Sequence, residues 1–206
     1  TFNHSMQVAN LAAEIANKVG AKAQLVRTGA LYHDIGKLEN AVFFTENQNG
    51  QNPHDGLSYE RSARIIIQHV DKGLRLAAKY KLPTVERDFI STHHDRSVTR
   101  YFYNSYKKEH PDADIDARLF TYPGPKPQTL EQAILMMADA VEAASRSLPE
   151  YTEESINAMV EKIVSTQVSE GNFNECSITF REITEAKEVL CARLRTIYHT
   201  RIQYPE

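Results

Sequence analysis

The chain has 206 residues, of which 41% are hydrophobic, so it is long enough to bury one sizeable core. The formal net charge of -3 gives no basic excess, which argues against a general binder of nucleic-acid polymers but leaves room for small anionic substrates beside local positive charge. Cys176 and Cys191 form no CxxC pair, so a disulfide framework is not expected and a reducing cytosol fits. No apolar run reaches membrane-spanning length, and no signal peptide is visible.

Most of the sequence follows the helical period, which predicts an all-α protein. An apolar stripe from Val8 to Val19 predicts a first helix that ends at Gly20. A second helix is predicted over 24–35. The many Asn, Gly and Pro residues of 39–57 predict a long polar connection, and loops of this length are often functional.

Ser58 starts the next predicted helix, which runs to Val70, and a shorter helix is predicted over 75–80. Pro83 opens a further helix, whose apolar ridges continue into the double histidine at 93–94.

Four prolines forbid a regular helix over 111–129. Helix is predicted to resume at Leu130. Two scaffold helices are predicted over 153–168 and 179–198.

Five histidines and two aspartates fall where the helical pattern directs side chains inward. Buried imidazoles and carboxylates in this number need a compensating partner, and a pair of bound metal ions is the simplest one. The candidate ligands are His4, His33, Asp34, His69, His93, His94 and Asp139.

The donor types indicate the kind of site. Imidazole and carboxylate suit iron, manganese, zinc or magnesium, and the lack of nearby cysteine argues against structural zinc. Seven ligands are too many for one ion. Adjacent helical residues point about 100° apart, so His33 and Asp34 can address neighbouring ions, as can His93 and His94. Two ions roughly 3.5 to 4 Å apart activate a shared water and stabilise a phosphoryl transition state, which predicts hydrolysis of a phosphate ester.

Each candidate also has an ordinary structural explanation. Taken singly, His69 would be a core histidine bonded to a backbone carbonyl, and Asp139 a helix cap or an ion-pair partner. Lys37 follows Asp34 by three residues on the same face and could bind a phosphate oxygen, yet alone it would be a solvated charge. His54 lies in the polar loop, where a turn-stabilising role and a substrate contact are equally open.

The segment Leu-Tyr-His-Asp-Ile-Gly-Lys at 31–37 resembles the HD-domain phosphohydrolase superfamily. A closer likeness is to the cytoplasmic HD domain of seven-transmembrane receptor-HD proteins, the cyclic di-AMP phosphodiesterases of the PgpH type. The supporting stretches run from one end of the chain to the other: 4–5 with 8–12, 46–48, 52–55, 93–94, 101–103, 122–129, 138–144 and 201–206.

This resemblance implies that residues 1–206 form a single HD domain, a helical bundle with additional C-terminal helices. It implies iron or manganese as the metal and the opening of cyclic di-AMP to linear pApA. By position it implies one metal set of His4, His33, Asp34 and Asp139 and a second set of Asp34, His69, His93 and His94.

In this interpretation Asp34 and Lys37 are the catalytic residues. Asp34 bridges the two ions and Lys37 binds phosphate. His54 is a candidate substrate contact and the candidate proton donor to the leaving oxygen, a role that the sequence does not otherwise identify. The chain opens abruptly, with a candidate ligand at residue 4. We therefore expect a domain cut from a longer protein anchored in the bacterial cell membrane, with this domain in the cytoplasm; the oligomeric state is left open.

One departure from the family follows the double histidine, where Gly and Thr are common and this chain has Asp95, Arg96 and Ser97. The two charges could alter substrate contacts or neutralise each other. The Tyr-Pro-Gly order at 122–124 differs from the Gly-Tyr-Pro element of the related cyclic di-GMP enzymes, which disfavours that substrate. Two further functions stay open at this point: hydrolysis of a mononucleotide or an alarmone, and non-catalytic sensing of a cyclic dinucleotide.

Overall fold

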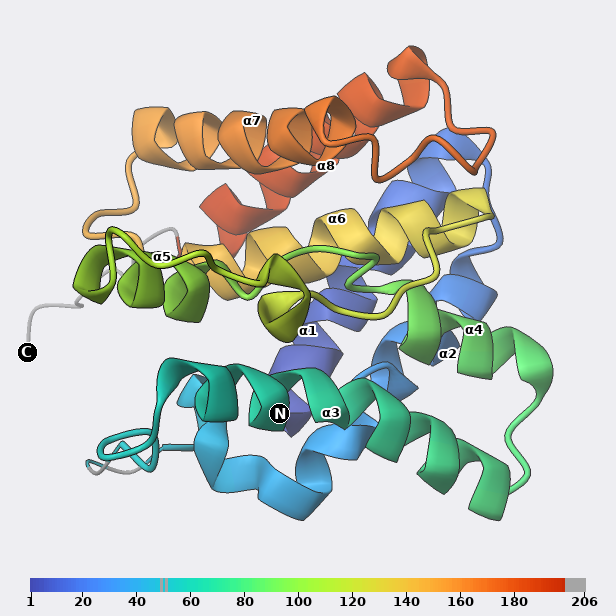
Figure 1. Ribbon diagram of the computed structural model, residues 1–206. Helices are drawn as coiled ribbons and strands as arrows, with labels where there is room; N and C mark the ends of the chain where they lie inside the picture. The colour runs from blue at the N-terminus through green and yellow to red at the C-terminus, as the bar shows by residue number, and fades with distance from the viewer. Residues whose placement is uncertain (49, 51, 199–206) are drawn as a thin grey trace, which may run out of the picture.

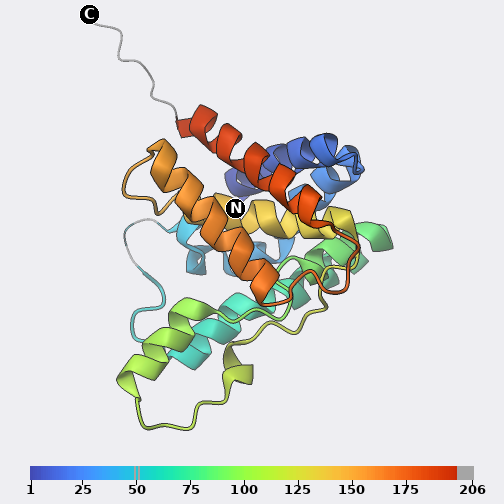
Figure 2. The same ribbon diagram turned by 90° about the horizontal axis from the view of Figure 1, so that it is seen from above.

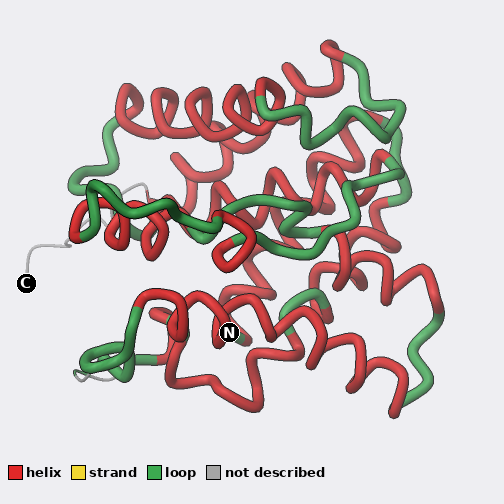
Figure 3. Tube along the Cα trace, viewed as in Figure 1, coloured by secondary structure: helices red, strands yellow, loops and turns green. Residues whose placement is uncertain are grey.

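The structure, a computed structural model, describes residues 1–48, 50 and 52–198; the stretch 201–206 of the family likeness lies outside them. Within the described residues every element of regular secondary structure is a helix, as Figure 3 shows. This confirms the all-α prediction. The elements in chain order are α1 (Phe2–Val19), α2 (Ala23–Tyr32), the 3-10 helices η1 (Ile35–Phe43) and η2 (Thr45–Asn47), α3 (Tyr59–Lys79), α4 (Thr84–Thr92), α5 (Arg100–Glu109), the 3-10 helix η3 (Ala117–Phe120), α6 (Leu130–Ser145), α7 (Glu153–Ser169) and α8 (Phe180–Tyr198).

Helix α6 runs through the middle of the molecule and is buried along most of its length (Figure 1). It contacts α1, α2, α4, α7 and α8. Helices α7 and α8 lie side by side over it, as the view in Figure 2 shows. The main apolar core is built from these helices and contains no residue of α3, which packs instead on η1, α4 and α5.

Several helix ends follow the local signals in the sequence. Gly20 ends α1 in the left-handed conformation with φ 79°, which glycine adopts without steric strain. The Ser58 side chain accepts a hydrogen bond from the backbone of α3, and the Thr129 side chain does the same for α6. The predicted starts at Ser58 and Leu130 are therefore confirmed.

Helix α3 is continuous, so the predicted interruption between Val70 and residue 75 is wrong. Gly73 lies inside the helix and is kept there by tertiary packing. A Cβ atom on Gly36 of η1 would lie 1.8 Å from the carbonyl oxygen of His69 and 2.4 Å from the backbone nitrogen of Gly73. Two glycines thus let η1 and α3 touch through their backbones, which offsets the weak helix propensity of glycine.

The second predicted helix, 24–35, ends early. Helix α2 stops at Tyr32, and Asp34, with φ -105° and ψ 13°, begins the change of direction into η1. The segment 39–57, predicted as a long polar connection, contains the end of η1 and all of η2. The chain therefore turns at the His-Asp pair itself.

Helix α5 was not predicted. No side chain in α5 is fully buried, so the burial pattern that marks the other helices is weak there. The segment 111–129 contains no α-helix, as predicted, only the short η3. An isolated antiparallel bridge joins Val98 to Thr121 and ties this segment to the residues that follow the double histidine. Among the described helices, none combines the length and apolarity that a bilayer crossing requires.

Candidate metal centre

All seven predicted ligands converge on one place, although they come from different elements. His4 lies on α1 and Asp139 on α6. Six of the seven residues are no more than 7% exposed, and only His94 is half-buried. The other ligands are His33 and Asp34 between α2 and η1, His69 on α3, and His93 and His94 at the end of α4.

One group of ligands forms around His4 and His33. The Nε2 atom of His4 lies 2.9 Å from Oδ1 of Asp139 and 3.4 Å from Oδ2 of Asp34. The Nε2 atom of His33 lies 3.3 Å from the same oxygen of Asp34 and 3.5 Å from Oδ1 of Asp139. Two imidazoles and two carboxylates therefore surround one small space.

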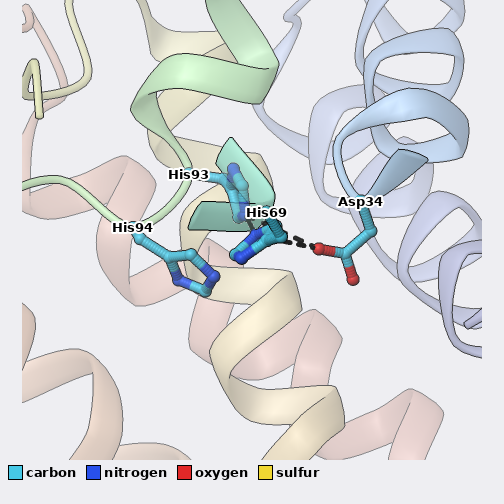
Figure 4. A group of neighbouring side chains, drawn as sticks. All are labelled: Asp34, His69, His93 and His94. Carbon is cyan, nitrogen blue, oxygen red and sulfur yellow. Dashed lines mark hydrogen bonds and ion pairs between the residues drawn. The ribbon is translucent and has the colours of Figure 1, made fainter. Parts of the chain in front are cut away.

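A second group forms on the other side of Asp34. Its Oδ1 atom lies 3.4 Å from Nε2 of His69 and 3.7 Å from Nε2 of His93, and these two nitrogens are 3.2 Å apart. Ligand atoms of Asp34, His69, His93 and His94 all lie within 4.8 Å of one another. Figure 4 shows Asp34 and His94 on opposite sides of His69 and His93.

The Asp34 carboxylate therefore turns Oδ2 toward one group and Oδ1 toward the other. This is the arrangement that a carboxylate needs to bridge two cations. Helical geometry alone places His33 and Asp34 in different directions, and the turn at Asp34 completes the separation.

The residues fit a pair of divalent metal ions. Nε2 of His33 and Oδ1 of Asp34 are fully buried and have no hydrogen-bond partner within the described residues. Buried polar atoms are nearly always paired, so atoms left without a partner inside a ring of nitrogen and oxygen donors mark a place that a cation could fill. Imidazole and carboxylate donors suit iron, manganese or zinc.

Three ligand histidines are oriented in the same way. The Nδ1 atoms of His33, His69 and His93 lie 2.6, 2.7 and 2.9 Å from the carbonyl oxygen three residues earlier. Each ring then donates through Nδ1 and presents Nε2 to the centre, which fixes the tautomer that binds a metal. The helix that carries each histidine thus also orients its ring.

His4 is oriented by Glu142, a residue to which the sequence analysis gave no role. Nδ1 of His4 forms a short hydrogen bond with Oε2 of Glu142, and Nη2 of Arg146 lies 2.7 Å from both carboxylate oxygens. A carboxylate behind a ligand histidine raises its basicity and holds its ring. Glu142 follows Asp139 by three residues on α6. This spacing places both on one helix face and is the sequence signal that could have identified Glu142 as part of the centre.

Lys37 lies against the bridging carboxylate. Its Nζ atom is 2.6 Å from Oδ2 of Asp34, 3.0 Å from Oε1 of Glu46 and 4.8 Å from the centre of the Phe44 ring. The sequence predicts a phosphate contact for Lys37 and no role for Glu46. Here the ammonium group is held between two carboxylates at the edge of the centre.

The charges of the first group balance one another. Burial lowers the pKa of His33, but the charges of Asp34 and Asp139 and the hydrogen bonds to both carboxylates together outweigh burial and raise the pKa to about 10. Burial likewise opposes the charged form of His4, and hydrogen bonds to Asp139 and Glu142 raise its pKa to about 9. Protons on these two rings stand where a cation would stand, so metal binding must displace them.

In the second group of residues, which contains His93 and His94, two imidazole pKa values are lowered instead of raised. Burial lowers the pKa of His93 to about 3, and the neighbouring His33 and His69 add to this effect. Burial, followed by the charge of His93, also holds the pKa of His94 well below its usual range. Neutral imidazole is the form that binds a metal, so these two rings are ready to do so.

Two pockets open onto the centre. The larger, about 710 Å³, lies between α6 and α7, and the smaller, about 350 Å³, contains His4 and Lys37. Both are lined by His94, Asp139 and Ala143. The ligands can therefore be approached from two directions.

His54 lines a different pocket, formed with residues such as Tyr59 and Tyr106. Its Nε2 atom lies 2.9 Å from the carbonyl oxygen of Phe43, and its ring packs against Phe43 and Phe102. Of the two roles that the sequence left open for His54, this arrangement favours stabilisation of the loop.

Asp95 and Arg96 form no ion pair in the part of the chain that the structure describes, which disfavours one of the two alternatives left open for these charges, that they neutralise each other. Asp95 is buried, has φ 52°, and accepts a short hydrogen bond from the side chain of Asn172. Arg96 lies against Gly124. The turn after the double histidine is thus fastened to the loop between α7 and α8.

Comparisons with known proteins agree with this geometry. The family described as the HD domain matches residues 1–144. Over 207 residues the chain is 44% identical to the cyclic-di-AMP phosphodiesterase PgpH of Bacillus subtilis (strain 168) and 43% identical to that of Listeria monocytogenes serotype 1/2a (strain 10403S). Each match covers 100% of this chain and 29% of the relative, so the chain spans under a third of those proteins.

The fold is similar to a crystal structure of the L. monocytogenes phosphodiesterase PgpH HD domain in complex with cyclic-di-AMP. The TM-score is 0.92 at 42% sequence identity, and the match covers 98% of this chain and 93% of that chain.

Proposed function

Because the chain belongs to the HD-domain family, we propose that it is a metal-dependent phosphodiesterase that hydrolyses cyclic di-AMP to linear pApA. The observation that carries this proposal is the pair of ligand groups that share Asp34. The names of its relatives and the cyclic-di-AMP in the similar solved domain support the choice of substrate.

We infer that the centre takes two divalent transition-metal ions, iron or manganese. His4, His33 and Asp139 would hold one ion, His69, His93 and His94 the other, and Asp34 both. When bound, the ions would activate water and stabilise negative charge on the phosphoryl group. The nitrogen and oxygen donors support this choice of metals.

The residues around the centre supply position and charge. Asp34 would keep the two ions at a fixed separation, and Lys37 beside it would place an ammonium next to the scissile phosphate. The larger pocket is walled by small residues of α6 and apolar residues such as Met159 and Ile163 of α7. Its volume of about 710 Å³ suits a nucleotide-sized ligand, and such walls accept the flat face of a purine.

A small substrate panel tests the reaction. The purified domain is loaded with manganese and incubated with cyclic di-AMP, cyclic di-GMP, a mononucleotide and a guanosine alarmone, and the products are separated by chromatography. We expect preferential conversion of cyclic di-AMP to pApA. A preference for the mononucleotide or the alarmone would contradict cyclic di-AMP as the substrate. A domain that binds both ions and cyclic di-AMP but leaves the cyclic di-AMP intact would be a sensor.

We further infer that residues 1–206 are a single domain of a longer protein anchored in the bacterial cell membrane, and that this domain lies in the cytoplasm. The share of 29% of the relatives' length supports this inference. Fractionation of cells that express the full-length protein tests it. The account expects the domain in the membrane fraction, protected from external protease in intact cells, whereas recovery in the soluble fraction would contradict it.

A further inference from the structure

His94 differs from the other ligand histidines in how its ring is held. Within the described residues its side chain makes no hydrogen bond, whereas His33, His69 and His93 each bond a carbonyl oxygen and His4 bonds a carboxylate. His94 also borders both pockets and is the most exposed of the ligands. Its ring is held by other rings instead, with ring centres 4.0 Å from His93 in a tilted arrangement and 4.2 Å from Tyr122.

The ring of Tyr122 lies directly against the ring of His94. The two ring centres are 4.2 Å apart and the planes are inclined by 27°, which is a stacked arrangement. Tyr122 is 7% exposed, and its ring also meets the edge of His69 at 6.1 Å. The contact thus covers one face of the only ligand ring that lacks a polar partner among those described.

The backbone holds Tyr122 in register with the double histidine. The backbone nitrogen of Tyr122 donates to the carbonyl oxygen of Ser97 at 3.0 Å, and Thr121 pairs with Val98. The backbone nitrogen of Thr99 donates to Phe120 at 2.7 Å. Because these bonds join the segment before α6 to the residues after His94, the stacked rings cannot drift apart independently.

We propose that Tyr122 is a positioning residue that orients His94 toward the second metal ion by stacking, in the place of the hydrogen bond that each of the other ligand histidines has. This inference rests on the proposed metal centre and not on the identity of the substrate. The aromatic ring carries the effect, and the phenol hydroxyl does not.

Three variants separate the ring, the hydroxyl and the fold. Tyr122→Phe keeps the ring and removes the hydroxyl. Tyr122→Leu removes the ring. Phe120→Leu is the matched control, because Phe120 is a fully buried aromatic residue of the same segment that packs on Tyr103 and Tyr106 instead of on a ligand.

The readout is the number of manganese ions per chain and the affinity of each site, measured by elemental analysis and metal titration of the whole domain. We expect two ions in the wild type, in Tyr122→Phe and in Phe120→Leu. In Tyr122→Leu we expect one tightly held ion and about 10–100-fold weaker binding of the second, the range typical for groups that orient a ligand. The rate of cyclic di-AMP hydrolysis should fall in proportion to the occupancy of the second metal site.

Circular dichroism establishes that each variant is folded, and Tyr122→Met replaces the leucine variant if that one is not, with the same expected result. Two tightly held ions in the ringless variant would overturn the positioning role, as would equal losses in Tyr122→Leu and Phe120→Leu. Fewer than two ions in the wild type would instead overturn the metal centre of the proposed function, and this inference with it.

Discussion

Asp34 joins the two halves of the candidate metal centre. Its side chain is 2% exposed, its two oxygens face different ligand groups, and Lys37 lies beside it. Burial opposes its charged form, yet the charges of His33 and Lys37 hold the pKa of its carboxyl well below the usual range. The carboxylate is therefore ionised and available to both groups.

Replacing Asp34 by Ala should disturb both sites at once, because each group loses the oxygen that faces it. We expect almost no bound metal in the Asp34→Ala domain and a loss of turnover greater than the ~10–100-fold typical of residues that only orient a ligand. Elemental analysis and a cyclic di-AMP assay measure the two effects. Asp71→Ala, which removes an exposed carboxylate from α3, serves as the control. Near-normal metal content in Asp34→Ala would contradict the bridging role.

Glu142 should affect one site only. In Glu142→Ala the His4 ring loses its carboxylate partner, so we expect the ion held by His4 to bind about 10–100-fold more weakly while the other ion is retained. Metal titration resolves the two steps. The control is Glu131→Ala at the other end of α6, where the carboxylate bonds the backbone of Lys22. If Glu142→Ala weakened the binding of both ions equally, Glu142 would not act through His4 on one site alone.

The residues that converge on the candidate metal centre could be singled out from sequence patterns, whereas most residues that support them could not. His69 and His93 continue apolar ridges of their helices, which marks them as buried without any knowledge of the fold. The partner of His4 is 138 residues away, and its identity depends on how α1 meets α6. The same holds for Tyr122, which meets His94 only because two irregular segments pair.

At the scale of elements, the contact between η1 and α3 places His69 opposite the His-Asp pair. Gly36 allows the two backbones to touch, and the carbonyl oxygen nearest to it belongs to His69 itself. The position of this ligand therefore depends on the absence of a side chain in a different element.

Gly36→Ala should separate η1 from α3, because the new methyl group would overlap backbone atoms that have no alternative position. We expect a loss of about 1–3 kcal/mol in the free energy of unfolding, measured by denaturant titration, together with weaker metal binding. Gly20→Ala is a suitable comparison, since it strains a backbone at φ 79° in open space far from any predicted ligand. If Gly36→Ala left the metal affinity unchanged, the contact between η1 and α3 would not be what positions His69 at the centre.

Element boundaries show where sequence patterns stop being informative. The break predicted in α3 was wrong because buried contacts with Gly36 and Ile90 hold the helix together through Gly73. Helix α5 escaped prediction because it lies at the edge of the fold and fully buries none of its side chains. By contrast, capping residues such as Ser58 act locally, and the helix ends that they mark were predicted correctly.

At the scale of the whole molecule, the ligands link α1, the α2–η1 turn, α3, α4 and α6. Helix α3 shares no residue with the main apolar core, so the candidate metal centre is one of the places where α3 meets the other helices. Metal ions that bind only the folded chain should therefore stabilise it.

Removal of the metal should lower the melting temperature. An ion present at about 100 times its dissociation constant contributes about 2.7 kcal/mol, which corresponds to roughly 5–10 °C for a domain of this size. Thermal unfolding with and without a chelator measures the shift, and the Asp34→Ala domain should show none. An identical melting temperature in both conditions would mean that no ion links these helices.

The most direct test of the account is the number of metal ions per chain in the purified wild-type domain, determined by elemental analysis. The shared carboxylate and the two ligand groups predict two transition-metal ions. A domain that holds one ion or none after exposure to excess iron or manganese would contradict the dinuclear centre on which the proposed activity rests.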